Sequence, residues 1–163
     1  MSKLYVNEIA PKSGSTIIMP ATVGSVVQTV YAETTTATSI TSTTSGSGTS
    51  TGLSVTITPK SVTNKLLINY VGYFLLATHS APAVSVEFYD GSSVVATDIQ
   101  WGIYINGDGS EHNNRWRYPF MAFVTPPSSG EITYTVRAWK AGNAVTAQYA
   151  SAPSMISIQE IQQ

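Results

Sequence analysis

The chain has 163 residues and a formal charge of −1, from eight basic and nine acidic side chains, and only 10% of its residues are charged. This near-neutral balance argues against a nucleic-acid binder, which needs a basic surface to neutralise phosphates. The absence of cysteine excludes disulfide frameworks, thiol catalysis and cysteine-based zinc sites.

The first 24 residues predict a small arm outside the folded core. They hold a short apolar strand at 4–9, a turn at 11–14 and a second apolar patch at 17–19. Because so short a segment cannot bury these side chains alone, we expect residues 1–24 to form an attachment or oligomerisation arm and residues 25–163 to form one domain. No apolar run has the length of a signal peptide or a membrane span, so we expect no leader and no membrane insertion.

From residue 25 onward, apolar and polar side chains alternate with a period of two, which is typical of half-buried strands. The pattern is clear at Leu53 to Thr58, at Val84 to Phe88 and at Ile132 to Ala138. No window favours an amphipathic helix of ordinary length. About ten strands in one domain predict an antiparallel sandwich or barrel; we expect them near residues 25–32, 35–41, 53–58, 65–78, 84–89, 93–101, 115–124, 131–139, 144–149 and 155–161.

Turn signals and one low-complexity segment separate these strands. Asp90-Gly91 predicts a tight hairpin, because both residue types tolerate positive φ. Similar signals lie at 106–109 and 141–143, and 126–130 predicts a longer loop. Residues 34–51 consist almost entirely of Ser, Thr and Gly, which predicts either a flexible linker or an exposed, weakly registered edge ribbon.

Two predicted strands carry apolar side chains on both faces. In the strand at 65–78, one face holds Leu66, Ile68, Tyr70, Phe74 and Leu76, and the other holds Leu67, Val71, Tyr73, Leu75 and Ala77. The strand at 116–124 has Tyr118, Phe120 and Ala122 on one face and Met121 and Phe123 on the other. One sandwich core covers only one face of each strand, so the second face is expected to contact a partner.

Three features resemble catalytic or metal sites, and each has a simpler explanation. Residues 48–52 match G-x-S-x-G, but a nucleophile elbow needs a strand before it and a helix after it, so chance explains the match. The two histidines are His79, which we interpret as a loop residue, and His112. Although His112 follows Asp108 and Glu111, the loop lacks the spacing of a calcium loop and is interpreted as a polar connection.

The remaining candidates are carboxylates and aromatic rings. Six Glu and three Asp, each isolated in its own strand or turn, give no positive sign of a glycosidase pair. Trp101, Trp116 and Trp139 are candidate sugar-stacking platforms, although aromatic residues in sandwiches more often belong to the core or to subunit contacts. The sequence therefore predicts no enzyme, no catalytic residues, no cofactor and no metal site, and it identifies no ligand-binding residues.

Several segments together resemble a module of tailed bacteriophages of marine and freshwater bacteria. They are Gly24 to Val30 followed by the Thr/Ser tract, then Thr51 to Ser61, Asn64 to Ile68, the closing Ser157 to Ile161, and the opening Leu4 to Ile9 with Ser13-Gly14. Members of this family are tail fibre or virion structural proteins, and the resemblance covers nearly the whole chain. It implies an antiparallel jelly-roll β-sandwich, similar in layout to the trimeric heads of tumour-necrosis factor and C1q.

The resemblance also implies a function and a location. We expect a homotrimeric tail-fibre or adhesin-type component, assembled in the host cytoplasm and exposed on the virion surface for host attachment. Its partners would be other virion proteins of the tail, baseplate or capsid, with a host surface glycan as a further candidate. Because only 24 residues precede the module, a head decoration (cement) protein that stabilises the capsid is the alternative. A carbohydrate-binding module is the second alternative.

Overall fold

The computed structural model describes residues 24–78, 82–98, 102–104, 112–142, 144–148 and 152–163. Within these ranges there is no helix that is long and apolar enough to cross a membrane. The structure is built from β-strands, and the sequence prediction of an all-β fold is confirmed. The strands are β1 (Val26–Thr34), β2 (Thr38–Ile40), β3 (Thr49–Ile57), β4 (Lys65–Thr78), β5 (Ala83–Tyr89), β6 (Val94–Thr97), β7 (Ile103–Tyr104), β8 (His112–Val124), β9 (Ile132–Ala141), β10 (Val145–Ala147) and β11 (Ser154–Ile161).

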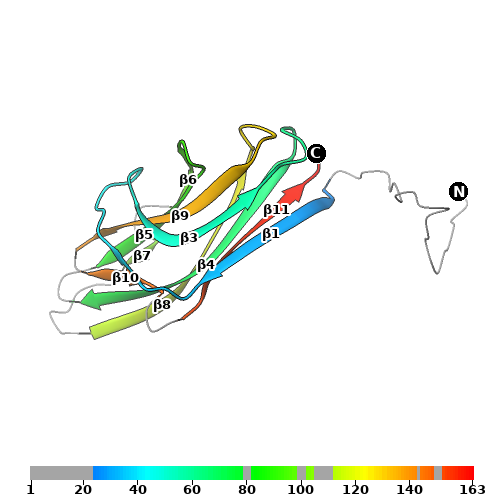
Figure 1. Cartoon of the computed structure of the whole chain (residues 1–163). Coiled ribbons are helices and arrows are strands. Elements are labelled where there is room, and N and C mark those ends of the chain that lie inside the picture. The colour runs from blue at the N-terminus through cyan, green and yellow to red at the C-terminus, as the bar shows by residue number, and fades with distance from the viewer. Residues whose placement is uncertain (1–23, 79–81, 99–101, 105–111, 143, 149–151) are drawn as a thin grey trace, which may run out of the picture.

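The strands form two antiparallel sheets that face each other (Figure 1). The larger sheet has the order β1-β11-β4-β10-β2, and β8 pairs with β4 as well. Two strands share one edge of β4, where β11 pairs with residues 65–71 and β10 pairs with residues 74–76. The other edge of β4 pairs along residues 66–78 with β8. The smaller sheet has the order β3-β9-β5-β6, with β7 on β5.

The pairing of distant strands identifies the topology. β5 pairs with β6, β4 with β8, β3 with β9 and β1 with β11, so each pair encloses the previous one in the sequence. The chain is therefore one long antiparallel ribbon, folded at the β5–β6 turn and rolled up so that its pairs contribute alternately to the two sheets. This is the connectivity of a jelly roll.

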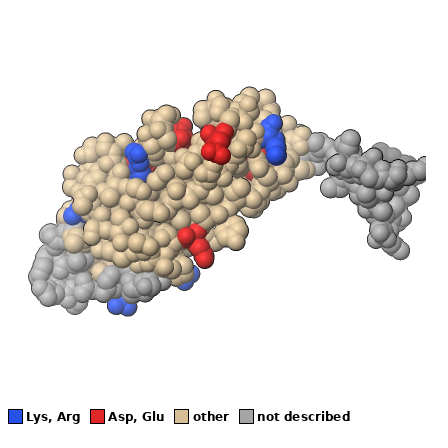
Figure 2. Space-filling view, viewed as in Figure 1, with Lys and Arg blue, Asp and Glu red and all other residues tan. Residues whose placement is uncertain are grey.

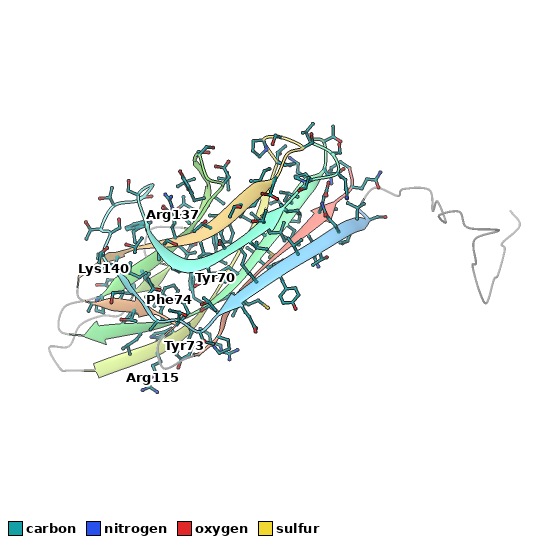
Figure 3. All side chains as sticks on the ribbon, in the orientation of Figure 1. Tyr70, Tyr73, Phe74, Arg115, Arg137 and Lys140 are labelled. Atoms are coloured by element: carbon teal, nitrogen blue, oxygen red, sulfur yellow. The ribbon has the colours of Figure 1, made fainter. Side chains whose placement is uncertain are left out.

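The core lies between the sheets and consists of the side chains that alternation predicts. Leu66, Ile68, Tyr70, Phe74 and Leu76 of β4 are buried, as are Leu53, Val55 and Ile57 of β3 and Ile132, Tyr134, Val136 and Ala138 of β9. Phe88 of β5 stacks on Phe120 of β8 with ring centroids 4.6 Å apart, which joins the two sheets through aromatic contact. Figure 3 shows Tyr70 and Phe74 between the sheets.

The prediction that β5 is half-buried is wrong, because its polar residues are buried as well. Ser85 and Glu87 lie on the outer face of the smaller sheet and have no exposed surface. The residues between β2 and β3 cover this face: the backbone N–H groups of Gly46 and Gly48 donate to the Glu87 carboxylate at 2.9 and 2.8 Å. Burial of the carboxylate is tolerated because these donors satisfy it.

The same contacts decide between the two predictions for residues 34–51. The segment is not a linker, because β2 pairs with β10 in a defined register and the backbone N–H of Lys140 donates to the Ser42 carbonyl. The edge-ribbon alternative is nearer to the structure. β3 begins at Thr49, four residues before the predicted start, and its register with β9 shifts between Ser50 and Ser54 around Gly52, whose φ is +78°. A bulge at a glycine explains why the alternation is clear only after it.

Other predictions have mixed outcomes. The hairpin at Asp90-Gly91 is confirmed, with Gly91 at φ +94° and the Asp90 carboxylate accepting hydrogen bonds from Ser92 and Ser93. The strand predicted at 93–101 ends at Thr97 within the described residues, and β7 was not predicted. The predicted arm lies outside the described residues except for Gly24, so the division at residue 24 stays a prediction.

Candidate interface on the outer face of the larger sheet

Alternation along β4 and β8 places a second set of side chains on the outer face of the larger sheet. The outward residues of β4 are Leu67, Asn69, Val71, Tyr73 and Leu75, and their register partners on β8 are Phe123, Met121, Pro119, Arg117 and Arg115. Figure 3 shows Tyr73 and Arg115 on the side of this sheet that faces away from the core. The face predicted to need a partner is therefore turned away from the core.

The outward side chains of β8 are among the most exposed apolar groups of the described residues. Met121 is 62% exposed and Phe123 is 64% exposed, whereas their inward neighbours Phe120 and Ala122 pack against the core. Leu67, Val71, Tyr73 and Leu75 are half-buried, because strands lie on both sides of β4. The prediction about which side chains lie on each face is confirmed for residues 66–76 of β4 and 118–123 of β8, and the side chain of Ala77 lies outside the described part.

The apolar face continues across β11 to β1. Met155 of β11 is the register partner of Val71, and it is 44% exposed. Tyr31 of β1 lies in the same row as Met121, through Ser157 and Asn69, and it is 72% exposed. Apolar side chains thus occur at both edges of a four-stranded surface, which we call the outer face: β1, β11, β4 and β8.

A shallow hollow of about 340 Å³ lies on the outer face between β4 and β8. Its lining residues are Asn69, Tyr70, Val71, Pro119, Phe120 and Met121. Pro119 has no backbone N–H, and a proline in a strand is tolerated mainly at a sheet edge. The hollow can accept an apolar side chain from a partner, but it contains no charged group that would identify a small-molecule substrate.

The surface of the smaller sheet is mainly polar, although Tyr104 of β7 is 56% exposed. The outward residues of β3 and β9 include Ser54, Thr56 and Thr133, and the hydroxyl oxygens of Thr56 and Thr133 lie 2.8 Å apart. Figure 2 shows charged side chains spread singly over the side of the molecule that it draws, without a large cluster of either sign. Most of the exposed large apolar side chains on the described strands belong to the larger sheet, and Tyr104 belongs to the smaller one.

Glu160 accepts hydrogen bonds from four residues, and its contacts indicate a structural role. It is buried in β11 and accepts hydrogen bonds from the backbone N–H groups of Lys60 at 2.8 Å and Ser61 at 3.2 Å, and from the side-chain amides of Asn64 at 2.6 Å and Gln28. Burial acts to raise the pKa of Glu160, but these donors outweigh it and hold the pKa below its ordinary value. The carboxylate fixes the β3–β4 connection to β1 and β11.

Two buried tyrosines also belong to the core. Burial, with a smaller contribution from Asp90, raises the pKa of Tyr134 to about 12. Burial likewise raises the pKa of Tyr70 well above its ordinary value. Both phenols remain protonated at neutral pH and neither faces a candidate catalytic partner.

Those predicted candidates that the structure describes do not come together as a catalytic or metal site. Ser50 of the G-x-S-x-G match is an outward residue inside β3, and its hydroxyl accepts a hydrogen bond from the Gly52 N–H, so it has no elbow geometry. His112 is the first residue of β8, while His79, Asp108 and Glu111 lie outside the described residues. In the described part of the chain, no three His, Asp or Glu side chains gather as a metal site would require.

The three tryptophans do not form one aromatic platform among the described residues. Trp139 is buried on the outer side of β9, next to Ser85. Trp116 is 49% exposed on β8, and Trp101 lies outside the described residues. The sugar-site hypothesis therefore gains no support from their arrangement.

Sequence reasoning missed the contribution of β1 and β11 to the outer face. Tyr31, Glu33 and Met155 are isolated outward residues in strands whose other side chains follow ordinary alternation. The signal was present in the alternation of β1, but only the pairing of β1 with β11 brings these residues onto the same surface as Met121.

Comparison with known proteins identifies no family for the chain. No protein-family model matches it, and no curated protein sequence matches it. Among solved structures, the VP2 protein of infectious bursal disease virus in T=1 particles has 15% sequence identity and a TM-score of 0.45, with 95% of this chain and 41% of that chain covered. A chain from the T13 particle of that virus has 16% sequence identity and a TM-score of 0.42, with 94% of this chain and 40% of that chain covered. The chain thus spans about two fifths of the length of these proteins.

Proposed function

We propose that the protein is a non-enzymatic structural component of a virion and works as a self-associating jelly roll. Jelly rolls are frequent in viral capsid and lectin domains. The observation that carries the proposal is the difference between the two sheets. The smaller sheet presents mostly hydroxyl groups, with Tyr104 as its exposed large aromatic side chain, whereas the larger sheet presents Met121, Phe123, Tyr31 and Met155 to solvent. A surface of this kind on a compact domain indicates a protein–protein contact.

The finer assignment rests on the sequence resemblance to phage virion proteins described above. It favours a homotrimer exposed on the virion as a tail-fibre or adhesin-type component that contacts the host surface. A head decoration protein bound to the capsid shell is the alternative, because the same jelly roll and the same outer face suit a subunit that binds a lattice of other proteins.

The test is to locate the chain in intact virions of the phage that encodes it. A small epitope added after Gln163 and labelled with gold-conjugated antibody shows the position of each copy in electron micrographs. Gold at the distal tail supports the tail-fibre proposal, and gold distributed over the head supports the decoration alternative instead. Virions that carry no label, although the tagged protein is made and folded, would contradict both.

A further inference from the structure

The outer face carries charges of opposite sign at its two edges. Glu33 lies on β1, in the row that continues through Met155 and Val71 to Pro119 of β8. Arg117 lies on β8 next to Pro119 in the outward series, and Arg115 is the next outward residue. Glu33 and Arg117 are both exposed, and the intervening strands β11 and β4 keep them apart within one copy.

These charges limit how two copies can meet through this face. If β1 met β1, Glu33 would face a second Glu33, and if β8 met β8, the arginines of both copies would repel one another. If β1 of one copy meets β8 of the next, Glu33 approaches Arg117, and Tyr31 and Met155 approach Met121 and Phe123. Charge and apolar contact then favour the same arrangement.

The size of the outer face also suits a second copy. The four strands of the outer face range from 8 residues in β11 to 14 in β4. At about 3.3 Å of length per residue and 4.8 Å of width per strand, they cover roughly 700 Å². A stable protein–protein interface buries about 800 Å² on each partner. A small ligand would leave most of the exposed apolar side chains uncovered, whereas neighbouring copies that each cover one edge of the face would together cover them.

We propose that the outer face is the subunit interface of this protein, with the β1 edge of one copy, at Tyr31, Glu33 and Met155, against the β8 edge of the next, at Arg117, Met121 and Phe123. The proposal deepens the proposed function, since it rests on self-association and identifies the surface responsible. This arrangement explains why the β1 and β8 edges of the outer face are both apolar and why their charges differ in sign. When each copy uses two different edges, a ring of copies closes if the rotation between neighbours allows it.

Cross-linking tests the contact directly, because the natural chain has no cysteine to react in the background. Full-length Glu33→Cys and Arg117→Cys variants are made separately, mixed, dissociated and allowed to reassemble together. The mixture is then treated with a short bis-maleimide. We expect a cross-linked dimer from the mixture and little from either variant alone. A cross-linked dimer formed as readily by the Glu33→Cys variant alone, or by the Arg117→Cys variant alone, would overturn the arrangement. A mixture of Glu131→Cys and Thr56→Cys, at exposed positions away from the outer face, is the control and should not cross-link.

Charge exchange provides an independent measurement in solution. We expect Glu33→Lys to weaken self-association by about tenfold or more, because the lysine then faces the arginines of the neighbour. Adding Arg117→Glu to Glu33→Lys should recover most of that loss, whereas Glu131→Lys should have no effect. Additive losses in the double variant would overturn the proposed pairing.

The outcomes separate this inference from the proposed function. If the natural chain associates but Met121→Arg leaves association unchanged, the interface is elsewhere and the inference fails, while the proposed function stands. If the natural chain is monomeric at high concentration, it does not self-associate, and both the proposed function and the inference fail. Thr56→Arg, which introduces the same side chain on the smaller sheet, shows whether a loss in Met121→Arg comes from the interface.

Discussion

At the scale of single residues, Glu160 shows how one buried carboxylate fixes a loop that has no regular structure. Its four donors come from β1 and from the β3–β4 connection, so a change at one side chain releases several groups together. A buried donor or acceptor left without its partner costs about 1–3 kcal/mol. The contribution of this cluster therefore depends on the charge of Glu160.

The stability of the fold should depend on pH through Glu160. Because the folded-state pKa lies below its ordinary value of 4.5, the ionised group stabilises the fold above that pH, and this contribution is lost as the pH falls through the lower folded-state pKa. We expect Glu160→Gln to lower the free energy of unfolding at pH 7 by about 1–3 kcal/mol. Urea unfolding of both proteins between pH 7 and pH 3 measures the difference, which should shrink toward the acid end. Glu131→Gln, at an exposed position, is the control; an equal loss there, or a difference that does not change with pH, would contradict the prediction.

Gly72 shows what single-residue pattern reading cannot detect. In the sequence it interrupts the apolar series of β4 without an evident reason. In the structure a Cβ at this position would overlap the phenol of Tyr70, so the glycine leaves the space that this buried side chain occupies. The requirement comes from packing within β4, and alternation carries no information about it.

At the scale of elements, the part of the Ser/Thr/Gly segment around Gly46 and Gly48 is held by Glu87 of β5. Gly46 and Gly48 donate to Glu87, and a Cβ at Gly48 would lie 2.7 Å from the same carboxylate and 3.0 Å from Cβ of Arg137. Close approach of backbone to a buried carboxylate explains why this segment has small residues. Ser42 is held separately, by Thr49 and Lys140, so it is the part around Gly46 and Gly48 that depends on Glu87.

Glu87→Ala should release this segment without unfolding the sandwich. We expect faster amide hydrogen exchange at residues 43–48 and a loss of about 1–3 kcal/mol in the free energy of unfolding. Exchange in β4 and β11, measured in the same sample by mass spectrometry, should change much less. Glu131→Ala, at an exposed position, provides the matched control. Unchanged exchange at 43–48 in Glu87→Ala would show that other contacts hold the segment.

How much of the structure can be predicted from the sequence depends on the kind of contact. Alternation located the core face of β3, β4, β8 and β9, because burial of one strand face follows directly from a period of two. It misjudged β5, because Glu87 is covered by a segment about forty residues earlier in the sequence, as the Glu87–Gly48 contact shows. It found only the β4–β8 half of the outer face, since the other half exists only through the pairing of β1 with β11. Long-range contacts of this kind leave no local pattern.

The predicted arm can be tested as an element by deletion. Removal of residues 1–23 should leave the jelly roll folded, because strands β1 to β11 pair with one another to form both sheets. We expect an unchanged circular dichroism spectrum and unfolding temperature, together with loss of incorporation into virions. Normal incorporation of the shortened protein would remove the attachment role.

At the scale of the whole molecule, exposed apolar area is the quantity that predicts assembly. Burying a side chain such as Phe123 or Met121 contributes on the order of 1.5–3 kcal/mol. Several such groups on each copy are enough to offset the loss of translational freedom on association, which costs about 4–15 kcal/mol. We therefore expect light scattering on the purified chain to report three times its 17.3 kDa. A dimer would contradict the three-fold part of the prediction, and a monomer at micromolar concentration would contradict association altogether.

The nested pairing of the strands also determines when, during synthesis of the chain, the fold can form. The innermost pair brings Glu87 to Thr97, close along the chain, while the outermost brings Val26 to Ile161, nearly the full length of the domain. Contacts of high sequence separation make folding slow, in the range of milliseconds to seconds for sandwiches of this kind. Until β11 leaves the ribosome, β1 has no sheet partner and half of one edge of β4 is open. We expect closure of the sandwich to follow synthesis of β11, so that subunits assemble only after this strand has been made.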